Sequence, residues 1–352
     1  MHQNGNPFNI EDYRMPAEWE PHEATWLAWP HNQLTWPDQL DTIQNTWVEI
    51  IEALCPYEKV YVLVNDDCMA DEVRIKTGKI RAGLTNIFPV VIPTNDAWMR
   101  DAGPIFLSAK KYPSLIAQDF IFNSWGGKYA PWDEDDAVPT RIANKISVPC
   151  LKRNFILEGG SIDVNGKGTV MTTTSCLMNT NRNAQFSQKQ IEEHLKTFLG
   201  VSHAIWLEHG IEGDDTDGHI DDIARFVNHD TIATVVEADF NDANYKPLQE
   251  NLKKLNQSVD QDGQHFNIVL LPMPNRLDCS FGRCPASYAN FYIANNVVLV
   301  PTYSCPQDQD ALDIIQDLFP TRQIVGIEST PLIVGLGAIH CITQQQPALT
   351  GC

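Results

Sequence analysis

One amphipathic helix followed by one apolar strand is a pairing that recurs along this chain, and it constrains the fold more than any other feature. In the first pair, "PDQLDTIQNTWVEIIEAL" precedes "EKVYVLV", and apolar residues return at three- and four-residue steps behind Asp38 or Asp41 as the N-cap. The later pairs span residues 135–146 with 148–157, 187–200 with 201–207, 246–259 with 266–274, and 308–319 with 322–328. We therefore predict five helix-then-strand units.

Hairpin signals lie between these pairs. The segment "SIDVNGKGTVMTTT" contains an Asn-Gly turn, and "NFYIANNVVLVPTY" reverses at Asn295 and Asn296. In the helix expected at 187–200, Ser187 and Gln190 match a capping box, and Gly200 stands where a helix stops. Units about 50 to 60 residues apart indicate a radial or stacked structural repeat. Because no linker rich in Gly, Ser or Pro divides the chain, we expect a single α/β domain over residues 1–352.

Charge and hydropathy exclude several classes of partner. The 352 residues include 25 basic and 45 acidic side chains, for a formal net charge of −20, which disfavours a nucleic-acid partner and tolerates a small cation. The N-terminal stretch "MHQNGNPFNIEDYRM" has no basic flank or apolar run, and no later stretch approaches the ~20 apolar residues that span a bilayer. We expect a cytoplasmic protein that binds neither nucleic acid nor membrane.

Cys341 stands apart from the other cysteines. The nine cysteines are irregularly spaced without a Cys-x-x-Cys pair, which fits neither a disulfide framework nor a structural zinc site. In "VGLGAIHCITQQQP", however, Cys341 follows a glycine-bearing turn and adjoins His340. Free cysteine is often a buried, inert apolar residue, so this segment alone leaves both that interpretation and a nucleophile open.

Polar, glycine-rich segments follow several apolar strands, where a ring-shaped or barrel-shaped fold would gather a site. In "TNDAWMRDAGP", Asp96 adjoins Trp98, whose ring could wall a cleft, whereas Arg100 and Asp101 fit a surface turn with an internal ion pair. In "ILEGG", Glu158 precedes two glycines that let a ligand or another backbone come close. A solvated turn carboxylate explains Glu158 equally well.

The segment "DDTDGHIDDIARF" gathers carboxylates around His219. It lacks the glycine and terminal Glu of an EF-hand, and it lacks the second histidine or Cys pair of a zinc site. In an extended segment, His219 and Asp221 would project to the same side and offer an acid/base and an anion to one ligand. If the segment at Cys341 is also extended, His340 points away from the thiol, so His219 is the better partner for Cys341.

Taken together, these stretches resemble the agmatine deiminase family, part of a wider group of guanidino-group-modifying enzymes that includes bacterial-type peptidylarginine deiminases. The similarity runs through "MPAEWEPHEATWLAWPHN", "TNDAWMRDAGP", "WGGKYAPWDEDD", "FILEGGSIDVNGKGTVMTT", "DGHIDDIARF", "SYANFYIANNVVLVP" and "GAIHCITQQQP". It implies a fivefold pseudosymmetric α/β propeller of ββαβ units, the pentein fold. Family members carry a run of glycines before the nucleophile, which Leu336 and Ala338 interrupt here, so we expect a stiffer loop.

The resemblance also implies hydrolytic deimination of agmatine, in putrescine synthesis, without a metal or an organic cofactor. Motif by motif, it places the nucleophile at Cys341, the acid/base at His219 and a further active-site carboxylate at Glu158. It places the guanidinium-binding carboxylates at Asp96 and Asp221.

The far end of the substrate is expected to meet the acidic run beside His219. An ammonium there favours Asp215 or Asp214 as its partner, with Trp98 as an apolar wall. Three alternatives stay open: a deiminase of free or peptide-bound arginine, a polyamine-binding protein without activity, and a papain-like protease, although the local sequence of the last is missing. A homo-oligomer is also left open.

Overall fold

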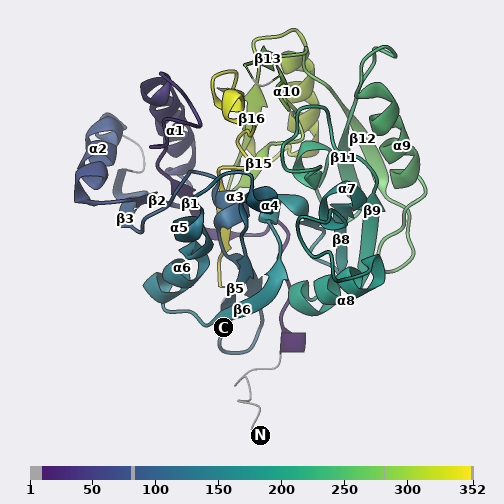
Figure 1. Ribbon diagram of the computed structural model, residues 1–352, viewed down its shortest axis with the longest axis horizontal. Helices are drawn as coiled ribbons and strands as arrows, with labels where there is room; N and C mark the ends of the chain where they lie inside the picture. The colour runs from purple at the N-terminus through teal and green to yellow at the C-terminus, as the bar shows by residue number, and fades with distance from the viewer. Residues whose placement is uncertain (1–9, 81–83, 281, 350–352) are drawn as a thin grey trace, which may run out of the picture.

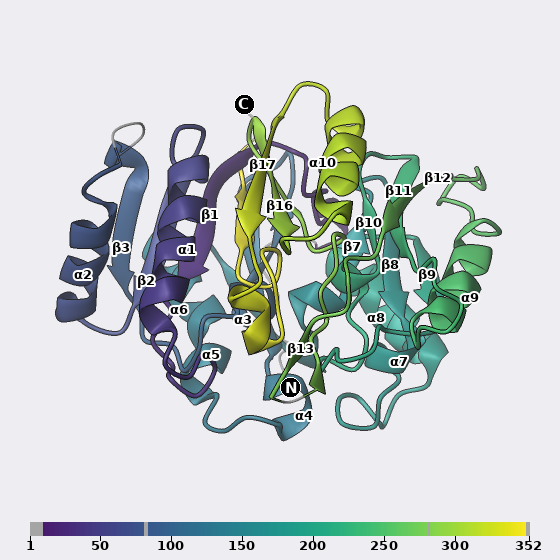
Figure 2. The same cartoon turned by 90° about the horizontal axis from the view of Figure 1, so that it is seen from above.

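The computed structural model describes residues 10–80, 84–280 and 282–349. Within these ranges, the strands lie toward the middle of the molecule and the longer helices lie around its outside (Figure 1). The same arrangement is visible from above (Figure 2). In their side-by-side order, the sheets are β18-β1-β2-β3, β4-β5-β6, β7-β8-β9, β10-β11-β12 and β15-β16-β17, with β13-β14 as a separate hairpin.

Several central strands, such as β5, β8, β11 and β16, are buried over nearly their whole length, as expected of strands covered on both faces. The bounds of the strands are β1 (His22–Ala28), β2 (Lys59–Val64), β3 (Ile87–Val91), β4 (Ile105–Ser108), β5 (Leu115–Ile121), β6 (Cys150–Ile156), β7 (Asp163–Val164), β8 (Thr169–Thr173), β9 (His203–Leu207), β10 (Ala224–Phe226), β11 (Thr231–Val236), β12 (Asn267–Pro272), β13 (Asp278–Cys279), β14 (Gly282–Arg283), β15 (Tyr292–Ala294), β16 (Val297–Thr302), β17 (Gln323–Glu328) and β18 (Gln344–Pro347).

The helices fall into a long set and a short set. The long helices are α1 (Leu40–Leu54), α2 (Asp67–Thr77), α6 (Val138–Ile146), α8 (Gln188–Leu199), α9 (Tyr245–Leu255) and α10 (Gln307–Leu318). The short helices are α3 (Met99–Ala102), α4 (Ser124–Gly127), α5 (Asp133–Asp136) and α7 (Thr174–Leu177), with 3-10 turns η1 (Ile10–Asp12), η2 (Leu84–Asn86), η3 (Gly159–Ser161), η4 (Ile220–Asp222) and η5 (Leu332–Gly335).

One pairing pattern is shared by the larger sheets. In the second sheet, β4 and β5 pair antiparallel, and the crossover through α6 then places β6 parallel to β5. The same order of an antiparallel pair, a crossover and a parallel strand is found in the sheets of β8, β11 and β16. A parallel neighbour needs such a crossover, so the repeated helix-then-strand signal follows from this topology.

The first sheet is built from both ends of the described chain. Strand β1 pairs antiparallel with β18, with Trp26 opposite Gln344 and His22 opposite Pro347, and it pairs parallel with β2. The indole of Trp26 is fully buried and donates from Nε1 to Gln346 Oε1 at 3.0 Å. This closure carries the turn before β18, which contains Cys341, into the interior.

The five predicted helix-strand pairs are confirmed as α1 with β2, α6 with β6, α8 with β9, α9 with β12, and α10 with β17. The capping box is confirmed as well, because the Ser187 backbone N–H donates to Gln190 Oε1 at 2.9 Å. Gly200 ends α8 with φ +67°, a left-handed conformation that glycine adopts without strain. An additional pair, α2 with β3, was not predicted and extends the first sheet.

The expected N-cap of α1 is wrong. Gln39 occupies that position without a side-chain cap bond, and Asp41 lies in the first turn of the helix. Asp38 has φ +58° and stands outside the helix, so neither aspartate can cap it.

Two sequence expectations concern, in part, residues outside the described chain. None of the eight described cysteines forms a disulfide, whereas Cys352 lies outside the described residues. Residues 1–9, on which the expectation of no leader partly rests, lie outside them too. Within the described ranges, no helix has the length and apolar character needed to cross a bilayer.

Candidate active site

The thiol of Cys341 is enclosed by polar groups. Cys341 is 5% exposed and lies in the turn before β18. Asn290 Nδ2 donates to its Sγ at 3.2 Å, and Asp221 Oδ2 lies 3.8 Å from the sulfur. Burial raises the pKa of the Cys341 thiol well above its ordinary value, and the carboxylates of Asp221 and Asp222 raise it further. These surroundings favour the thiol until a cation offsets the carboxylate charge.

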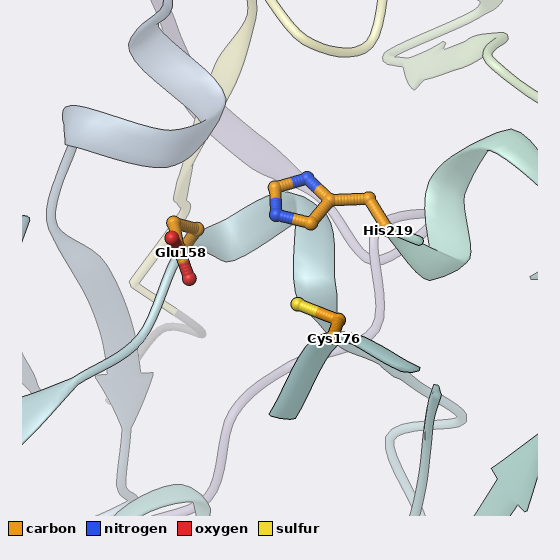
Figure 3. A group of neighbouring side chains, drawn as sticks. All are labelled: Glu158, Cys176 and His219. Atoms are coloured by element: carbon orange, nitrogen blue, oxygen red, sulfur yellow. The ribbon is translucent and has the colours of Figure 1, made fainter. Parts of the chain in front are cut away.

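His219 is buried close to Asp101 and Asp221, with its ring nitrogens unsatisfied. Neither nitrogen makes a hydrogen bond to a nitrogen or oxygen atom in the described ranges, and Nδ1 lies 3.7 Å from Asp101 Oδ1. The carboxylate of Glu158 and the thiol of Cys176 point toward the ring (Figure 3), and the three groups have atoms within 4.8 Å of one another. Burial alone would lower the pKa of His219, but Asp101 and Cys176 hold it well above the ordinary value.

Gly160 marks the point where three functional side chains converge. A Cβ at this position would lie 2.5 Å from His219 Nδ1, 2.7 Å from Asp101 Oδ1 and 3.1 Å from Asp221 Oδ2. Its backbone N–H donates to Asp101 Oδ1 at 2.9 Å. At Gly159, a Cβ would come within 2.3 Å of the backbone oxygen of Arg100. The close approach predicted for these two glycines is therefore present.

Glu158 is fixed by an internal cation, so its interpretation as a solvated turn carboxylate is wrong. Both of its oxygens accept from Arg182 Nε, at 3.0 and 3.1 Å, and both side chains are fully buried. Arg182 Nη2 also donates to the Thr216 carbonyl at 2.7 Å, and Nη1 donates to Asp217 Oδ2 at 2.8 Å. Arg182 thereby joins Glu158 to the loop that precedes His219.

The surface turn predicted for Arg100 and Asp101 is also wrong, because both side chains are buried and they have different partners. Arg100 Nη2 lies 3.1 Å from Glu18 Oε2, and its backbone N–H donates to the Cys341 carbonyl at 3.0 Å. Asp101 accepts instead from Trp125 Nε1 at 2.9 Å. Burial raises the pKa of Asp101, and this carboxylate faces His219 rather than solvent.

Asp96 lies at the edge of this group. Its Oδ2 accepts from Thr35 Oγ1 at 2.5 Å and from Asn32 Nδ2 at 3.2 Å. Burial raises the pKa of Asp96. The partners of Asp96 come from the segment after β1, whereas Asp101 is the carboxylate of this motif that contacts the groups around Gly160. The role predicted for Asp96 stays a prediction.

Trp98 lies against the loop that leads to Cys341. Its ring packs against Trp36, with centroids 5.4 Å apart, and the side chain is 7% exposed. A Cβ at Gly337 would lie 2.4 Å from the Trp98 ring and 3.1 Å from the Cys341 Cβ. The backbone of Gly337 therefore packs between the Trp98 ring and Cys341, and it leaves no space for a side chain at this position. Leu336, which interrupts the glycines, has φ +70° in this loop.

The two acidic candidates for the ammonium site have different surroundings. Asp214 Oδ1 accepts from the Thr216 backbone at 2.8 Å, and its Oδ2 accepts from the His219 backbone at 3.1 Å. Asp214 thus shapes the loop that carries His219. Asp215 is half-buried, with Oδ1 3.2 Å from Lys128 Nζ, and it accepts a hydrogen bond from the hydroxyl of Tyr129.

The extended geometry expected at His219 and His340 is wrong in both places. His219 is the N-cap of η4, which contains Asp221, and His340 lies in a turn. His340 Nδ1 lies 2.7 Å from Asp221 Oδ2, and Nε2 lies 2.8 Å from Glu18 Oε2. Both ring nitrogens of His340 therefore have carboxylate partners. His340 holds Asp221 in place and has no free nitrogen to act as a base for the thiol of Cys341.

Sequence reasoning missed several residues of the site: Glu18, Asp101, Asn290 and Arg182. Glu18 and Asn290 are far from Cys341 in sequence, and only the fold joins them to it. Two groups of side chains, around Glu158 and around Asp221, have metal-ligand atoms within 4.8 Å of one another. Neither is assigned as a metal site, because Arg182 already binds Glu158 and His340 already binds Asp221.

This chain belongs to the Porphyromonas-type peptidyl-arginine deiminase family, whose model matches residues 14–347. It is therefore a hydrolytic enzyme of the deiminase class. It is 35% identical over 365 residues to the agmatine deiminase of Stutzerimonas stutzeri, covering 96% of both chains.

Two solved structures extend the similarity over the whole fold. The agmatine deiminase of Enterococcus faecalis is 33% identical, covers 96% of both chains and gives a TM-score of 0.89. A cysteine-to-serine variant of the agmatine deiminase of C. jejuni, with its substrate bound, is 32% identical and gives a TM-score of 0.85 over 95% of this chain and 96% of that one. The family predicted from the order of the motifs is confirmed.

Proposed function

We propose that this protein is an agmatine deiminase, which hydrolyses agmatine to N-carbamoylputrescine and ammonia in putrescine synthesis. The observation that carries the proposal is the convergence at Gly160 of His219, Asp101 and Asp221. Both ring nitrogens of His219 and Oδ1 of Asp221 are buried without a hydrogen bond to a nitrogen or oxygen atom of the described chain. Buried polar atoms are costly when unsatisfied, so these atoms are suited to a polar cationic ligand.

The carboxylates of Asp101 and Asp221 are suited to bind opposite N–H edges of a guanidinium. A charge-assisted hydrogen bond of this kind contributes ~1.5 to 3 kcal/mol. The planar cation would then present one face of its central carbon to Cys341. The resemblance implies Asp96 for one of these carboxylates, and that role stays a prediction; we propose Asp101 as well, because it contacts the groups around Gly160.

The nucleophile is the thiolate of Cys341. Burial and the carboxylates of Asp221 and Asp222 raise the pKa of this thiol, so bringing a cation between the carboxylates lowers it again. Binding of the substrate thereby promotes loss of the thiol proton. The sulfur then adds to the guanidinium carbon and forms a tetrahedral intermediate.

His219 serves first as an acid and then as a base. Its imidazolium gives a proton to the leaving nitrogen, the C–N bond breaks and ammonia departs, which leaves a covalent S-alkylthiouronium on Cys341. Neutral His219 next takes a proton from water, whose oxygen attacks the same carbon. The C–S bond breaks, the hydroxyl proton passes to solvent, where ammonia takes it up as ammonium, and the thiolate returns with a neutral urea as the product. Glu158, held by Arg182 within reach of the imidazole, orients His219 or binds the substrate.

Asp215 remains our proposed partner for the ammonium end of agmatine. It lies on the same loop as His219, and Lys128 already shows that its carboxylate accepts an ammonium. Substrate binding would replace or share this contact. Trp98, on the other side of Gly337 from Cys341, would line the aliphatic part of the substrate.

We further propose that the five sheets are related by a fivefold pseudosymmetry and form one catalytic domain. The recurring antiparallel pair, crossover and parallel strand supports this arrangement. The closure of β1 by β18 supports a continuous ring of units. We propose that the enzyme acts in the cytoplasm without a cofactor.

The proposal is tested by measuring ammonia release from agmatine, with free arginine and a peptide containing arginine as comparison substrates. The wild type should release ammonia from agmatine and the Cys341→Ala variant should not. Quenching in acid followed by mass spectrometry should show an adduct on the peptide containing Cys341. Preference for either arginine substrate, or turnover that survives loss of the thiol, would refute the assigned substrate or the covalent mechanism respectively.

A further inference from the structure

Cys176 is a second buried thiol beside the imidazole, and the mechanism above does not use it. It is fully buried in α7, and its sulfur, a His219 ring nitrogen and a Glu158 oxygen lie within 4.8 Å of one another (Figure 3). Cys176 is thus a direct neighbour of the proposed acid/base.

The helix that carries Cys176 is attached to the loop that carries His219. Thr173 caps α7 by accepting from the Cys176 backbone N–H at 3.2 Å. The same hydroxyl donates to the carbonyl of Gly218, the residue before His219, at 2.5 Å. A Cβ at Gly218 would come within 2.2 Å of Ser175 Oγ, so α7 and this loop are in close contact. The thiol and the imidazole are therefore held in a fixed relation.

We propose that Cys176 is a positioning residue for His219, holding the imidazole in one orientation through both of its proton transfers. A thiol can donate its S–H to a neutral ring nitrogen, and its sulfur can accept from a protonated one. Such a partner suits a histidine that alternates between acid and base, because the contact persists in both states. This inference rests on the proposed function of His219.

The surroundings of Cys176 and His219 keep the Cys176 thiol neutral. Burial raises the pKa of Cys176, although Arg182 opposes the shift, so the thiol keeps its proton near neutral pH. The charged groups near His219 are Asp101 from α3, Asp221 and Asp222 from η4, Glu158 before η3 and Asp214 from its own loop. The ionised carboxylates can only accept a hydrogen bond, whereas the neutral thiol of Cys176 can both donate and accept.

The test compares Cys176→Ala, Cys176→Ser and wild type by the pH dependence of kcat. Loss of the polar contact removes an influence that raises the pKa of His219, so the alkaline limb should move to lower pH in Cys176→Ala. We expect kcat to fall about tenfold, a part of the ~10² to 10⁴ that an acid/base contributes, with little change in KM. Serine donates and accepts, so Cys176→Ser should restore much of both effects.

Cys55→Ala is the matched control, because Cys55 is a buried cysteine at the end of α1. It should leave the pH profile unchanged even if the melting temperature falls. A Cys176→Ala enzyme with a lower melting temperature but an unmoved alkaline limb would overturn the proposal, since a purely structural role predicts that result. Equal losses in the alanine and serine variants would overturn it as well.

A measurement without turnover separates this inference from the proposed reaction. In the Cys341→Ser background, NMR of labelled histidine should show a lower pKa for the His219 imidazole when Cys176→Ala is added. If this pKa shift is seen but the wild type does not hydrolyse agmatine, the proposed reaction is refuted, whereas the contact between Cys176 and His219 is supported. An unchanged imidazole pKa alongside normal agmatine turnover would refute the positioning role alone.

Discussion

His340 Nδ1 lies 2.7 Å from Asp221 Oδ2, so the residue next to the thiol in sequence is bonded to the carboxylate that faces the thiol. Its other nitrogen lies 2.8 Å from Glu18 Oε2. Burial alone would raise the pKa of Asp221, but His340 holds it below its ordinary value. This chain of contacts keeps Asp221 ionised for a cationic ligand and joins it to the segment before β1.

Glu18→Gln should destabilise the protein strongly at neutral pH. The Glu18 carboxylate contacts Arg100, Arg225 and His340 in the interior, and breaking a buried pair on one side costs about 3 to 5 kcal/mol. Burial would raise the pKa of Glu18, but Arg225 and His340 hold it well below 4.5. Its contribution is therefore complete above the unfolded-state pKa and is lost as the pH falls through the lower folded-state value.

Urea unfolding of wild type and Glu18→Gln at several pH values checks this. The difference in unfolding free energy should shrink as the pH drops below about 4.5. Glu23→Gln is the control, because Glu23 pairs with Lys59 at the exposed surface and should change stability by no more than about 1 kcal/mol. A pH-independent difference for Glu18→Gln would contradict the linkage.

Asp101→Asn should reduce kcat/KM for agmatine far more than Asp96→Asn. Loss of one charge-assisted contact worth ~1.5 to 3 kcal/mol corresponds to about a 10- to 150-fold decrease. Asp96 contacts Thr35 and Asn32, so its amide variant should lose less. Steady-state kinetics on the two matched variants decide between the two carboxylates, and a larger loss in Asp96→Asn would restore the role first predicted for that residue.

Gly160→Ala should inactivate the enzyme while the protein stays folded. The added methyl would collide with His219 Nδ1 and Asp101 Oδ1, so both side chains must move from their positions. We expect kcat to fall by at least ~10², the lower range of an acid/base contribution. Gly78→Ala, at the exposed end of α2, is the control for activity and melting temperature. Activity near wild type in Gly160→Ala would mean that catalysis does not require the positions of His219 and Asp101 next to Gly160.

Asp215→Ala and Asp214→Asn should have different kinetic effects. Loss of the Asp215 carboxylate should raise KM for agmatine about tenfold at similar kcat, the equivalent of ~1.4 kcal/mol. Loss of charge at Asp214 weakens its contact with the His219 backbone, so kcat should fall. An alkylguanidine without the ammonium is the control substrate, and its KM should be the same in Asp215→Ala and in the wild type. An unchanged KM for agmatine would remove Asp215 from the substrate site.

The pH dependence of kcat/KM and of kcat should differ on the acid side. In the free enzyme, burial and the carboxylates of Asp221 and Asp222 raise the pKa of Cys341, so kcat/KM should keep rising with pH above neutrality. A bound cation opposes these effects, so the acid limb of kcat should lie at lower pH. Coinciding limbs in the two profiles would contradict deprotonation assisted by the substrate.

The local sequence was sufficient for most of the repeated elements. Helices such as α1 and α8 have strong periodicity, and the turns at Asn296 and Gly200 use residues that tolerate positive φ. Strand β18 was not predicted because "QQQP" has little strand propensity. Its pairing with β1 depends on a distant segment, which local patterns cannot report.

The site was predicted only in part, again because local sequence patterns cannot report contacts between distant segments. Asp221 lies beside Cys341, and His219 lies beside Glu158, although 3-10 and turn geometry replaced the expected extended backbone. In "TNDAWMRDAGP" the two aspartates are five residues apart, and only the path of α3 shows that Asp101 faces His219. Residues such as Asn290 carry no local signal, because an amide acquires its role from the sulfur that the fold places beside it.

The pairing of β1 with β18 also affects how the protein is made. During synthesis β1 is made well before its antiparallel partner, because the residue opposite His22 is Pro347 in β18, which follows every other described strand. Until then one edge of β1 has no permanent partner, and unpaired edges promote association between chains. Shielding of this edge before β18 is made would therefore favour correct folding, and the turn that carries Cys341 is brought in together with β18.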